Sequence, residues 1–308
     1  MSDRHVIVGA GPVGTETARL LAAQGSQVVV VTRSGRSTGI DGVESVAVDA
    51  SDPASLSEVA EGAVALYNCA NPSTYSNKLW AQVWPPLAAS LLAAAETSGA
   101  VLVTASSLYP YGPVDLPMVG GMPDAATDAK GLIRARMWAD AKQAHDAGRI
   151  RAVEVRASDY VGTGVGANGH ISRIIPAALD GSPVRMLGDL DQPHSWTDVR
   201  DVARTLVKVA TTESAWGRVW HAPTNPPRTQ RQAVADVLAA VDRPMVKARA
   251  IPPVVLSIGS AFVPTMRALH DMSYIHTRPY VLDSAAARTE LGLEPTPWDE
   301  VCARTAVS

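Results

Sequence analysis

The fold of this chain is decided by the stretch His5-Val6-Ile7-Val8-Gly9-Ala10-Gly11-Pro12-Val13-Gly14. Its first four residues have the pattern of a short apolar strand, and three glycines follow at the spacing Gly-x-Gly-x-x-Gly. A helical pattern runs from Gly14 to Gln24, and a β-branched strand follows at 27–31. Because strand, glycine turn, helix and second strand follow in this order, the stretch predicts the first half of a dinucleotide-binding fold.

The glycine turn has the features of a pyrophosphate site. Glycine lets the backbone turn tightly and approach a phosphate closely, and the N-terminus of the following helix carries a partial positive charge. We therefore expect a dinucleotide to be bound at this turn by Gly9, Gly11, Pro12, Val13 and Gly14. A glycine-rich turn without a ligand is the alternative, and the flanking strand and helix disfavour it.

Strand and helix patterns alternate through the N-terminal half. Further strands are expected at 43–48, 63–67, 100–104 and 151–156, and helices at 53–60, 79–97 and 127–147. This alternation predicts an α/β fold, namely a Rossmann doubly wound parallel sheet with right-handed crossovers. Pro85 and Pro86 are expected to interrupt the helix at 79–97.

The alternation ends after Arg156, where a glycine-rich loop and less regular, proline-rich sequence follow. We interpret this remainder as a smaller C-terminal substrate-binding lobe that is interleaved with the sheet domain. The expected Rossmann domain comprises residues 1–157 and about 190–212, and the lobe comprises about 158–189 and 213–308.

The composition is that of an ordinary globular protein. The 308 residues are 46% hydrophobic and 19% charged, with a formal net charge of -3. We expect no nucleic-acid or membrane partner, because the charge is balanced and the apolar stretches are too broken to span a bilayer. No signal-peptide pattern precedes the first strand, so the expected location is cytoplasmic, as a monomer or homodimer.

The cysteines and histidines give no sign of a metal site. Cys69 and Cys302 are far apart and are expected to be reduced thiols. No Cys or His pair has the spacing of metal ligands, so no metal is expected. His170 and His194 could face a substrate, but a single histidine is more often satisfied by local hydrogen bonds.

The end of the second strand favours NADP(H) over NAD(H). A site for NAD usually has a carboxylate here for the ribose hydroxyls, whereas this chain has Thr32-Arg33-Ser34 and no carboxylate before Asp41. Arg33, with Arg36 nearby, is suited to a 2′-phosphate, because a guanidinium binds phosphate oxygens bidentately. Ser34 could add a hydroxyl donor, and a solvated Arg33 without a ligand is the alternative.

The end of the third strand supplies a further expected contact. Asp49 is suited to accept a hydrogen bond from the adenine amino group, and Ala50 lies beside it. With Thr32, Arg33 and Ser34, these residues form the expected adenosine end of the dinucleotide site.

Several segments together resemble the extended and atypical short-chain dehydrogenase/reductase group, the NAD-dependent epimerase/dehydratase-like proteins. The matching segments span nearly the whole chain. They are Gly9–Gly14, Asp49, Asn68–Pro72, Ser106–Gly112, Arg156–Gly162, Trp196–Ala203, Asp283–Ala285 and Glu290–Leu293. As a set these motifs are specific for the fold, but they say little about the substrate.

The resemblance implies further site residues. Cys69, Ala70 and Asn71, at the end of the fourth strand, would line the nicotinamide ribose. Ser107 matches the active-site hydroxyl of the family, which hydrogen-bonds the substrate oxygen and polarises it. A strand-end hydroxyl that bonds only to backbone is the alternative for Ser107.

The helix expected at 127–147 departs from the family pattern. Family members usually carry Tyr-x-x-x-Lys there: the Tyr exchanges a proton with the reacting oxygen, and the Lys lowers its pKa and holds the ribose. This spacing puts both side chains on one side of a helix. In this chain the Tyr position falls on Lys130 and the Lys position on Arg134.

Three interpretations of this departure stay open. Lys130 could be the proton donor, because partial desolvation beside Arg134 would lower its pKa; Arg134 could still hold the ribose. The donor could instead be Tyr109, Tyr111 or Tyr160. In the third interpretation catalysis is lost and the protein only senses the dinucleotide. The alternative for both helix residues is an exposed side chain without a function.

The sequence favours an NADP(H)-dependent oxidoreductase that transfers a hydride to or from a carbonyl-type small molecule. A redox-neutral epimerase, isomerase or dehydratase with a retained dinucleotide is the first alternative. A non-catalytic NADP(H)-binding sensor is the second.

Overall fold

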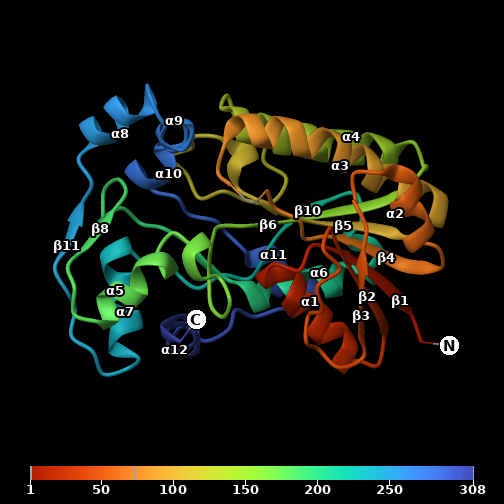
Figure 1. The fold of residues 1–308 in the computed structure, drawn as a ribbon, viewed down its shortest axis with the longest axis horizontal. Coiled ribbons are helices and arrows are strands. Elements are labelled where there is room, and N and C mark those ends of the chain that lie inside the picture. The colour runs from red at the N-terminus through yellow and green to blue at the C-terminus, as the bar shows by residue number, and fades with distance from the viewer. Residues whose placement is uncertain (1, 73, 308) are drawn as a thin grey trace.

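The core of the protein is a seven-stranded, fully parallel sheet, seen in a computed structural model that describes residues 2–72 and 74–307. The strand order is β10-β6-β5-β4-β1-β2-β3 (Figure 1). The strands are β1 (Arg4–Val8), β2 (Gln27–Thr32), β3 (Val43–Ala47), β4 (Ala63–Asn68), β5 (Val101–Ser107), β6 (Arg151–Ala157) and β10 (Val219–His221). The predicted doubly wound Rossmann sheet is therefore confirmed.

Helices cover both faces of this sheet (Figure 1). The helices are α1 (Pro12–Ala23), α2 (Pro53–Val59), α3 (Asn77–Ser98), α4 (Ala129–Asp146), α6 (Val199–Ala210) and α11 (Ala285–Leu291). One apolar core joins the sheet to α1 and α6, and a second joins its other face to α2, α3 and α4. Strands buried on both faces explain the unbroken apolar runs of β1 and β2.

Helix α3 is continuous through Pro85 and Pro86, so the expected interruption is wrong. The helix buries Trp80, Trp84 and Leu87 against its neighbours. Packing of these large side chains opposes the cost of two prolines in a helix interior, which is about 3 kcal/mol each. The tendency of proline to break a helix can be read from the sequence, whereas the packing of these side chains cannot.

The sequence pattern did not predict β10. This strand has three residues and pairs in parallel with β6, from Val219 opposite Glu154 to His221 opposite Arg156. A strand this short has too few residues for a recognisable period. The division of the chain into two lobes stays a prediction.

The remaining elements lie to one side of the sheet (Figure 1). They comprise two small two-stranded sheets, β7 (Asp159–Val161) with β9 (Trp196–Asp198) and β8 (Val184–Met186) with β11 (Ala248–Ala250), and the helices α5 (Ile175–Leu179), α7 (Gln230–Ala239), α8 (Pro253–Ser260), α9 (Pro264–Asp271), α10 (Tyr274–Thr277) and α12 (Trp298–Ala306). A third apolar core joins α5, α7 and α12.

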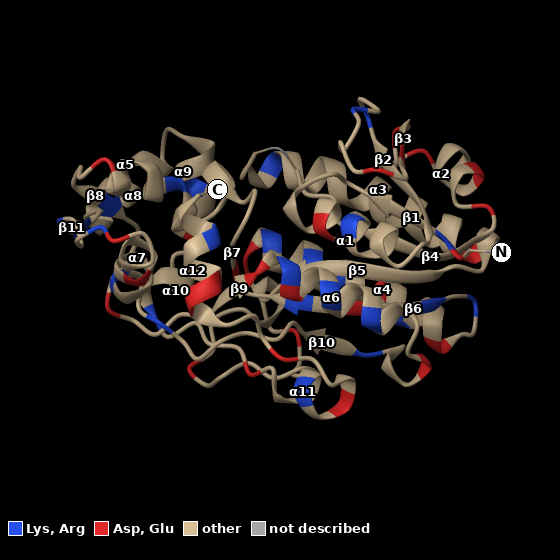
Figure 2. Cartoon of the chain, turned by 90° about the horizontal axis from the view of Figure 1, so that it is seen from below, with Lys and Arg blue, Asp and Glu red and all other residues tan. Residues whose placement is uncertain are grey.

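The surface carries charges of both signs. Figure 2 shows Lys and Arg residues interspersed with Asp and Glu residues over the sheet domain and the smaller elements. Among the described residues, no helix is long and apolar enough to cross a membrane.

The sheet topology fixes where a ligand can bind. The chain builds outward from β1 to β2 and β3 on one side, then returns to β4, β5 and β6 on the other. Open α/β sheets bind ligands at the carboxyl ends of the strands beside such a reversal. The turn after β1 and the segment after β4 therefore lie at the expected crevice.

Candidate active site

The glycine turn combines close packing with open space. Gly9 has φ 103°, and a Cβ on it would lie 2.9 Å from the Ala70 backbone. A Cβ on Gly14 would lie 2.0 Å from the Gly9 carbonyl oxygen. A Cβ on Gly11 would have no atom within 4 Å. Packing thus requires Gly9 and Gly14, while the space beside Gly11 is free for a phosphate to approach.

Helix α1 begins at this turn without a side-chain cap. Its N-cap residue is Gly11, no side chain bonds the first amides, and Pro12 occupies the first helical position. The amides of Val13 and Gly14 thus have no side-chain acceptor. Free N–H groups and the helix dipole together favour an anion at such a position.

The end of β2 forms a tight local turn. The Thr32 hydroxyl accepts a hydrogen bond from the Gly35 amide at 3.0 Å, and the Ser34 hydroxyl accepts one from the Arg36 amide at 3.3 Å. Arg33 is exposed and makes no ion pair among the described residues. Its guanidinium is thus available for a phosphate, but this exposure also fits the alternative of a solvated arginine, so the predicted contact stays a prediction.

The Asp49 carboxylate is used locally. Its Oδ1 atom accepts hydrogen bonds from the amide and hydroxyl of Ser51, at 3.0 and 2.6 Å. These bonds, with a smaller effect of Arg33, lower the pKa of Asp49. A carboxylate ionised in this way is suited to accept from an amino group, and its contact with adenine stays a prediction, as does that of Ala50.

The segment after β4 packs directly against the glycine turn. Asn68 is fully buried, its Oδ1 atom accepts from the Ala70 amide at 3.3 Å, and its Nδ2 atom has no partner among the described residues. Burial raises the pKa of the Cys69 thiol to about 12, so this thiol is unreactive. Asn71 is exposed. The predicted contacts of Cys69, Ala70 and Asn71 with a ribose stay untested.

Three hydroxyls at the carboxyl ends of β5 and β6 are buried without partners among the described residues. They belong to Ser106, Ser107 and Ser158. An unsatisfied buried hydroxyl costs about 1–3 kcal/mol, so such groups usually have a partner. Since the alternative for Ser107 was a hydroxyl satisfied by backbone, its free Oγ favours a role toward a ligand.

Lys130, in the first turn of α4, is fully buried rather than solvated. Its Nζ atom donates to Asn77 Oδ1 at 2.6 Å and lies 4.0 Å from the ring centroid of Tyr75. Desolvation lowers the pKa of Lys130 to about 8. The side chain therefore faces the start of α3 and an aromatic ring.

Arg134 lies one turn further along α4 and is also buried. Its guanidinium carbon lies 3.9 Å from the Trp84 ring centroid and 5.4 Å from that of Trp80. The Nε and Nη1 atoms are buried and have no hydrogen-bond partner among the described residues. The alternative of an exposed helical arginine is therefore wrong, and the group offers two free donors.

Arg134 is close enough to Tyr109 and Tyr160 to affect the pKa of both phenols. Tyr160 is in turn affected by Cys69, whose Cβ would lie 3.3 Å from a Cβ on Gly14. Burial raises the pKa of Tyr160 to about 12 and that of Tyr109 further. Cys69 and Tyr160 also pack against the same apolar core as Val13 of α1, so they lie in one region of the fold with the glycine turn.

Tyr111 is separated from this group. Its hydroxyl is 2.9 Å from His221 Nε2, and the Arg156 guanidinium lies 4.5 Å from its ring centroid. Arg156 in turn binds Glu154 and Asp124, at 2.6 Å each. Tyr111 is therefore part of a buried structural network, which leaves Tyr109 and Tyr160 as the two candidate proton donors near Arg134.

Comparison with known proteins decides the family. The model of the NAD dependent epimerase/dehydratase family matches residues 5–221, from β1 through β10. The chain belongs to this family. None of the curated protein sequences matches it. The predicted resemblance is thereby confirmed.

Several solved structures have a similar fold. MoeE5 in complex with UDP-glucose and NAD has a TM-score of 0.80 at 21% identity, over 99% of this chain and 98% of that one. The dTDP-glucose 4,6-dehydratase DesIV from Streptomyces venezuelae has 0.80 at 18%, over 99% and 96%. UDP-glucose 4-epimerase from Brucella ovis has 0.78 at 21%, over 99% and 98%. At these identities the likeness shows the fold alone.

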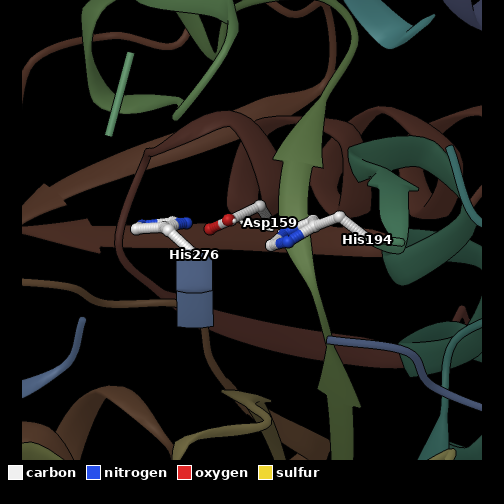
Figure 3. Close-up of side chains that lie close together, drawn as sticks. All are labelled: Asp159, His194 and His276. Carbon is white, nitrogen blue, oxygen red and sulfur yellow. Dashed lines mark hydrogen bonds and ion pairs between the residues drawn. The ribbon is translucent and has the colours of Figure 1, made fainter. Parts of the chain in front are cut away.

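This epimerase/dehydratase-family chain also contains a histidine cluster that sequence reasoning missed. His194 Nε2 lies 2.9 Å from Asp159 Oδ2 (Figure 3). The rings of His170 and His276 stack with centroids 4.0 Å apart. His194 is thus not an isolated histidine. The expectation of no metal rested on spacing along the chain, which cannot detect residues that the fold brings together.

Proposed function

We propose that this family member is an enzyme that binds NADP(H) and transfers a hydride to or from a carbon that carries the reacting oxygen of a small molecule. The observation that carries the proposal is the buried Arg134 guanidinium with two unpartnered donors. Such a group favours oxygen acceptors from a ligand, because buried donors without partners are costly even with the Glu154 charge nearby. Tyr160 and Cys69 pack against the same apolar core as α1, which supports a dinucleotide held at the glycine turn as that ligand.

The residues present fit a nicotinamide dinucleotide. The uncapped α1 N-terminus and the space beside Gly11 suit a pyrophosphate. The exposed Arg33 suits a 2′-phosphate, which favours NADP(H) over NAD(H). The free donors of Arg134 suit ribose hydroxyls. When bound, the nicotinamide supplies or accepts the hydride.

The chain's own residues then act on the reacting oxygen. The Ser107 hydroxyl, at the end of β5, donates a hydrogen bond that polarises it. Tyr109 follows two residues later and is hydrogen-bonded through its hydroxyl to that of Tyr75 at 3.3 Å, so the two phenols can relay a proton. Lys130 is held by Asn77 instead, and we assign it a structural role.

The overall reaction has two candidates. Family membership favours a redox-neutral epimerase or dehydratase, in which the dinucleotide is restored within each turnover. MoeE5 is a complex with UDP-glucose, and DesIV is a dTDP-glucose 4,6-dehydratase. A sugar nucleotide is therefore the first substrate class to test. The second candidate is a reductase that consumes NADPH, and the exposed Arg33 favours it, because NADP(H) is the usual reductive cofactor.

Both candidates require a bound dinucleotide, and calorimetry with NADP⁺ tests this requirement. We expect the wild type to bind NADP⁺, and Arg134→Met to lose affinity by about 10–100-fold, as hydrogen bonds to a charged group contribute about 1.5–3 kcal/mol. Arg136→Met is the matched control, because Arg136 is exposed on the same helix. If the two variants bind NADP⁺ equally well, Arg134 does not contact the dinucleotide, and the proposal loses the observation that carries it.

Turnover assays separate the two candidates. Wild-type protein is incubated with UDP-glucose, dTDP-glucose or a panel of carbonyl compounds, with and without added NADPH. A changed sugar without net NADPH loss supports the redox-neutral candidate. Stoichiometric NADPH consumption supports the reductase. Binding of NADP⁺ without any turnover on either panel would favour the non-catalytic sensor.

A further inference from the structure

Three residues from separate segments form a compact group of potential metal ligands. Asp159 is the first residue of β7, His194 precedes β9, and His276 lies in α10. Each offers one ligand atom, and these atoms all lie within 4.8 Å of one another. Figure 3 shows the Asp159 carboxylate between the two imidazole rings.

The backbone around His194 is rigidly paired. The His194 amide donates to the Arg228 carbonyl at 3.2 Å, and the Arg228 amide donates back at 2.9 Å. On its other side His194 forms a bridge with Tyr280. Asp159 is held in the β7–β9 ladder opposite Trp196. The positions of these two side chains are therefore set by the sheet backbone.

The segment of His276 is equally fixed. Its carbonyl accepts a hydrogen bond from the Asp189 amide at 2.8 Å. Gly188 has φ 71°, and a Cβ on it would lie only 2.2 Å from the His276 carbonyl oxygen. This close approach requires glycine at position 188, and it packs α10 against the loop after β8. Backbone contacts therefore fix the positions of all three residues of the ligand group.

One nitrogen of the group has no partner. The Nδ1 atom of His276 is buried and makes no hydrogen bond with any described residue. The ring is held in place by stacking on His170, whose Nε2 atom pairs with Gln230 Oε1 at 2.7 Å. A buried imidazole nitrogen without a partner is expected to be bound to something else.

We propose that Asp159, His194 and His276 bind a divalent transition-metal ion, of which zinc is the first candidate. Two imidazoles and one carboxylate suit zinc, which forms bonds of about 2.0–2.2 Å to nitrogen and oxygen. Ligand atoms around such an ion are about 3.3 Å apart, so the 2.9 Å contact between Asp159 and His194 opens slightly. The ligand atom of His276 already lies within 4.8 Å of the other two, so a small shift of its ring, still stacked on His170, brings it to that separation.

The ligand number indicates a site that binds more than the ion. Structural zinc sites have four protein ligands, whereas three leave a position for water or substrate. Asp159 is followed directly by Tyr160 and is close enough to Tyr109 to affect its pKa. The ion thus lies close to Tyr109 and Tyr160 of the candidate active site, where it attracts an oxygen of a small molecule.

Metal titration tests this proposal without reference to activity. Protein is purified with chelator, freed of the chelator and titrated with ZnCl₂ by calorimetry; CoCl₂ reports coordination by its visible absorption. We expect one strongly bound ion per chain and a higher Tm with zinc. His276→Gln and His194→Gln are expected to lose affinity at least about 10-fold.

The control is His270→Gln, because His270 is exposed on α9. It is expected to bind zinc as the wild type does. Circular dichroism confirms that each variant is folded, and Asp159→Asn gives a third, nearly isosteric test. Unchanged zinc binding in His276→Gln, or no one-to-one binding by the wild type, would overturn the proposal. Arg134→Met is expected to keep zinc affinity, so failure of the dinucleotide proposal is distinguished from failure of this one.

Discussion

The guanidinium of Arg134 stacks on the ring of Trp84, with 3.9 Å between the guanidinium carbon and the ring centroid. The two residues come from α4 and α3, which pack side by side on one face of the sheet (Figure 1). The stack holds the plane of the guanidinium while leaving its Nε and Nη1 donors free. A group oriented by an aromatic ring rather than by a carboxylate keeps its charge available for a ligand.

Loss of the Trp84 ring is therefore expected to weaken ligand binding as well as stability. Trp84→Leu should lower dinucleotide affinity by about 10-fold, because a buried cation–π contact contributes about 1–2 kcal/mol. Trp84→Phe should retain most of the affinity. Calorimetry measures the affinity, and urea unfolding measures the stability.

The control for this change is Trp138→Leu. Trp138 is on α4 and packs against the same apolar core, but it makes no cation–π contact with Arg134. This variant should lose stability without losing affinity. If both leucine variants weaken binding equally, the stack has no specific role in positioning Arg134.

Gly11 and Gly14 are expected to respond in opposite ways to alanine. Gly14→Ala places a methyl group 2.0 Å from the Gly9 carbonyl oxygen, so it should destabilise the fold by at least about 1–3 kcal/mol. Gly11→Ala meets no atom within 4 Å and has an extended backbone, so its stability should be nearly unchanged. It should nevertheless reduce dinucleotide affinity about 10-fold or more.

Thermal unfolding and calorimetry on the two variants check this contrast. A stable Gly11→Ala variant with wild-type affinity would show that no phosphate approaches this turn. The contrast also separates two functions that the Gly-x-Gly-x-x-Gly spacing cannot distinguish in the sequence, because only the structure shows which glycine faces the chain and which faces open space.

The sequence predicts features whose physics is local. Gly9 needs a positive φ, a strand and a helix flank it, and these conditions are visible in consecutive residues. The burial of Lys130 and Arg134 is different, because it depends on α3 packing beside α4. The sequence pattern predicted the helix that carries Lys130 and Arg134. It was equally consistent with exposed and with buried side chains at these two positions.

The histidine group lies beyond local reasoning altogether. Asp159 and His194 are separated by 35 residues, and His276 comes from another helix. The three residues are brought together by the β7–β9 pairing and by the packing of α10 against the loop after β8. A pattern that depends on tertiary contacts has no fixed spacing, so a search for ligand motifs in the sequence could not find it.

Arg33 is expected to select between the two dinucleotides. Arg33→Ala should weaken NADP⁺ binding by about 10–100-fold through the loss of a bidentate phosphate contact. NAD⁺ lacks that phosphate, so its affinity should change less than about 3-fold and serves as the internal control. Fluorescence or calorimetric titration with both cofactors measures the ratio. Equal losses for both would rule out the 2′-phosphate contact.

Ser107 and Tyr109 are expected to affect turnover rather than folding. Ser107→Ala should lower kcat by about 100-fold with little change in substrate KM, because polarisation is needed most in the transition state. Tyr109→Phe should lower kcat by about 100-fold or more through loss of a proton donor. Both require the substrate found in the turnover panels.

Tyr111→Phe is the matched control for these variants. It removes only the hydroxyl that contacts His221, so it should cost about 1 kcal/mol of stability and leave kcat near the wild-type value. If Tyr109→Phe is as active as Tyr111→Phe, the proton comes from another group. Lys130→Met tests the alternative donor in the same assay, and we expect it to keep most of the activity.

Lys130 is expected to make the stability depend on pH. Burial lowers its pKa from 10.5 to about 8 in the folded protein, so the unfolded chain binds more protons between these values. The free energy of unfolding should therefore rise with pH across this window, as the cost of the buried charge is removed. Below about pH 8 the full cost is present, partly offset by the bond to Asn77.

Urea unfolding of the wild type and of Lys130→Met, at pH values from about 7 to 10.5, measures this effect. The wild type should gain stability relative to the variant as the pH rises, because the variant has no charge to lose. NMR titration of the Cε signals provides a direct check, since the chain has five lysines and the variant identifies one of them. A midpoint near 10.5 would show that Lys130 is solvated, and would restore it as an ordinary surface residue of α4.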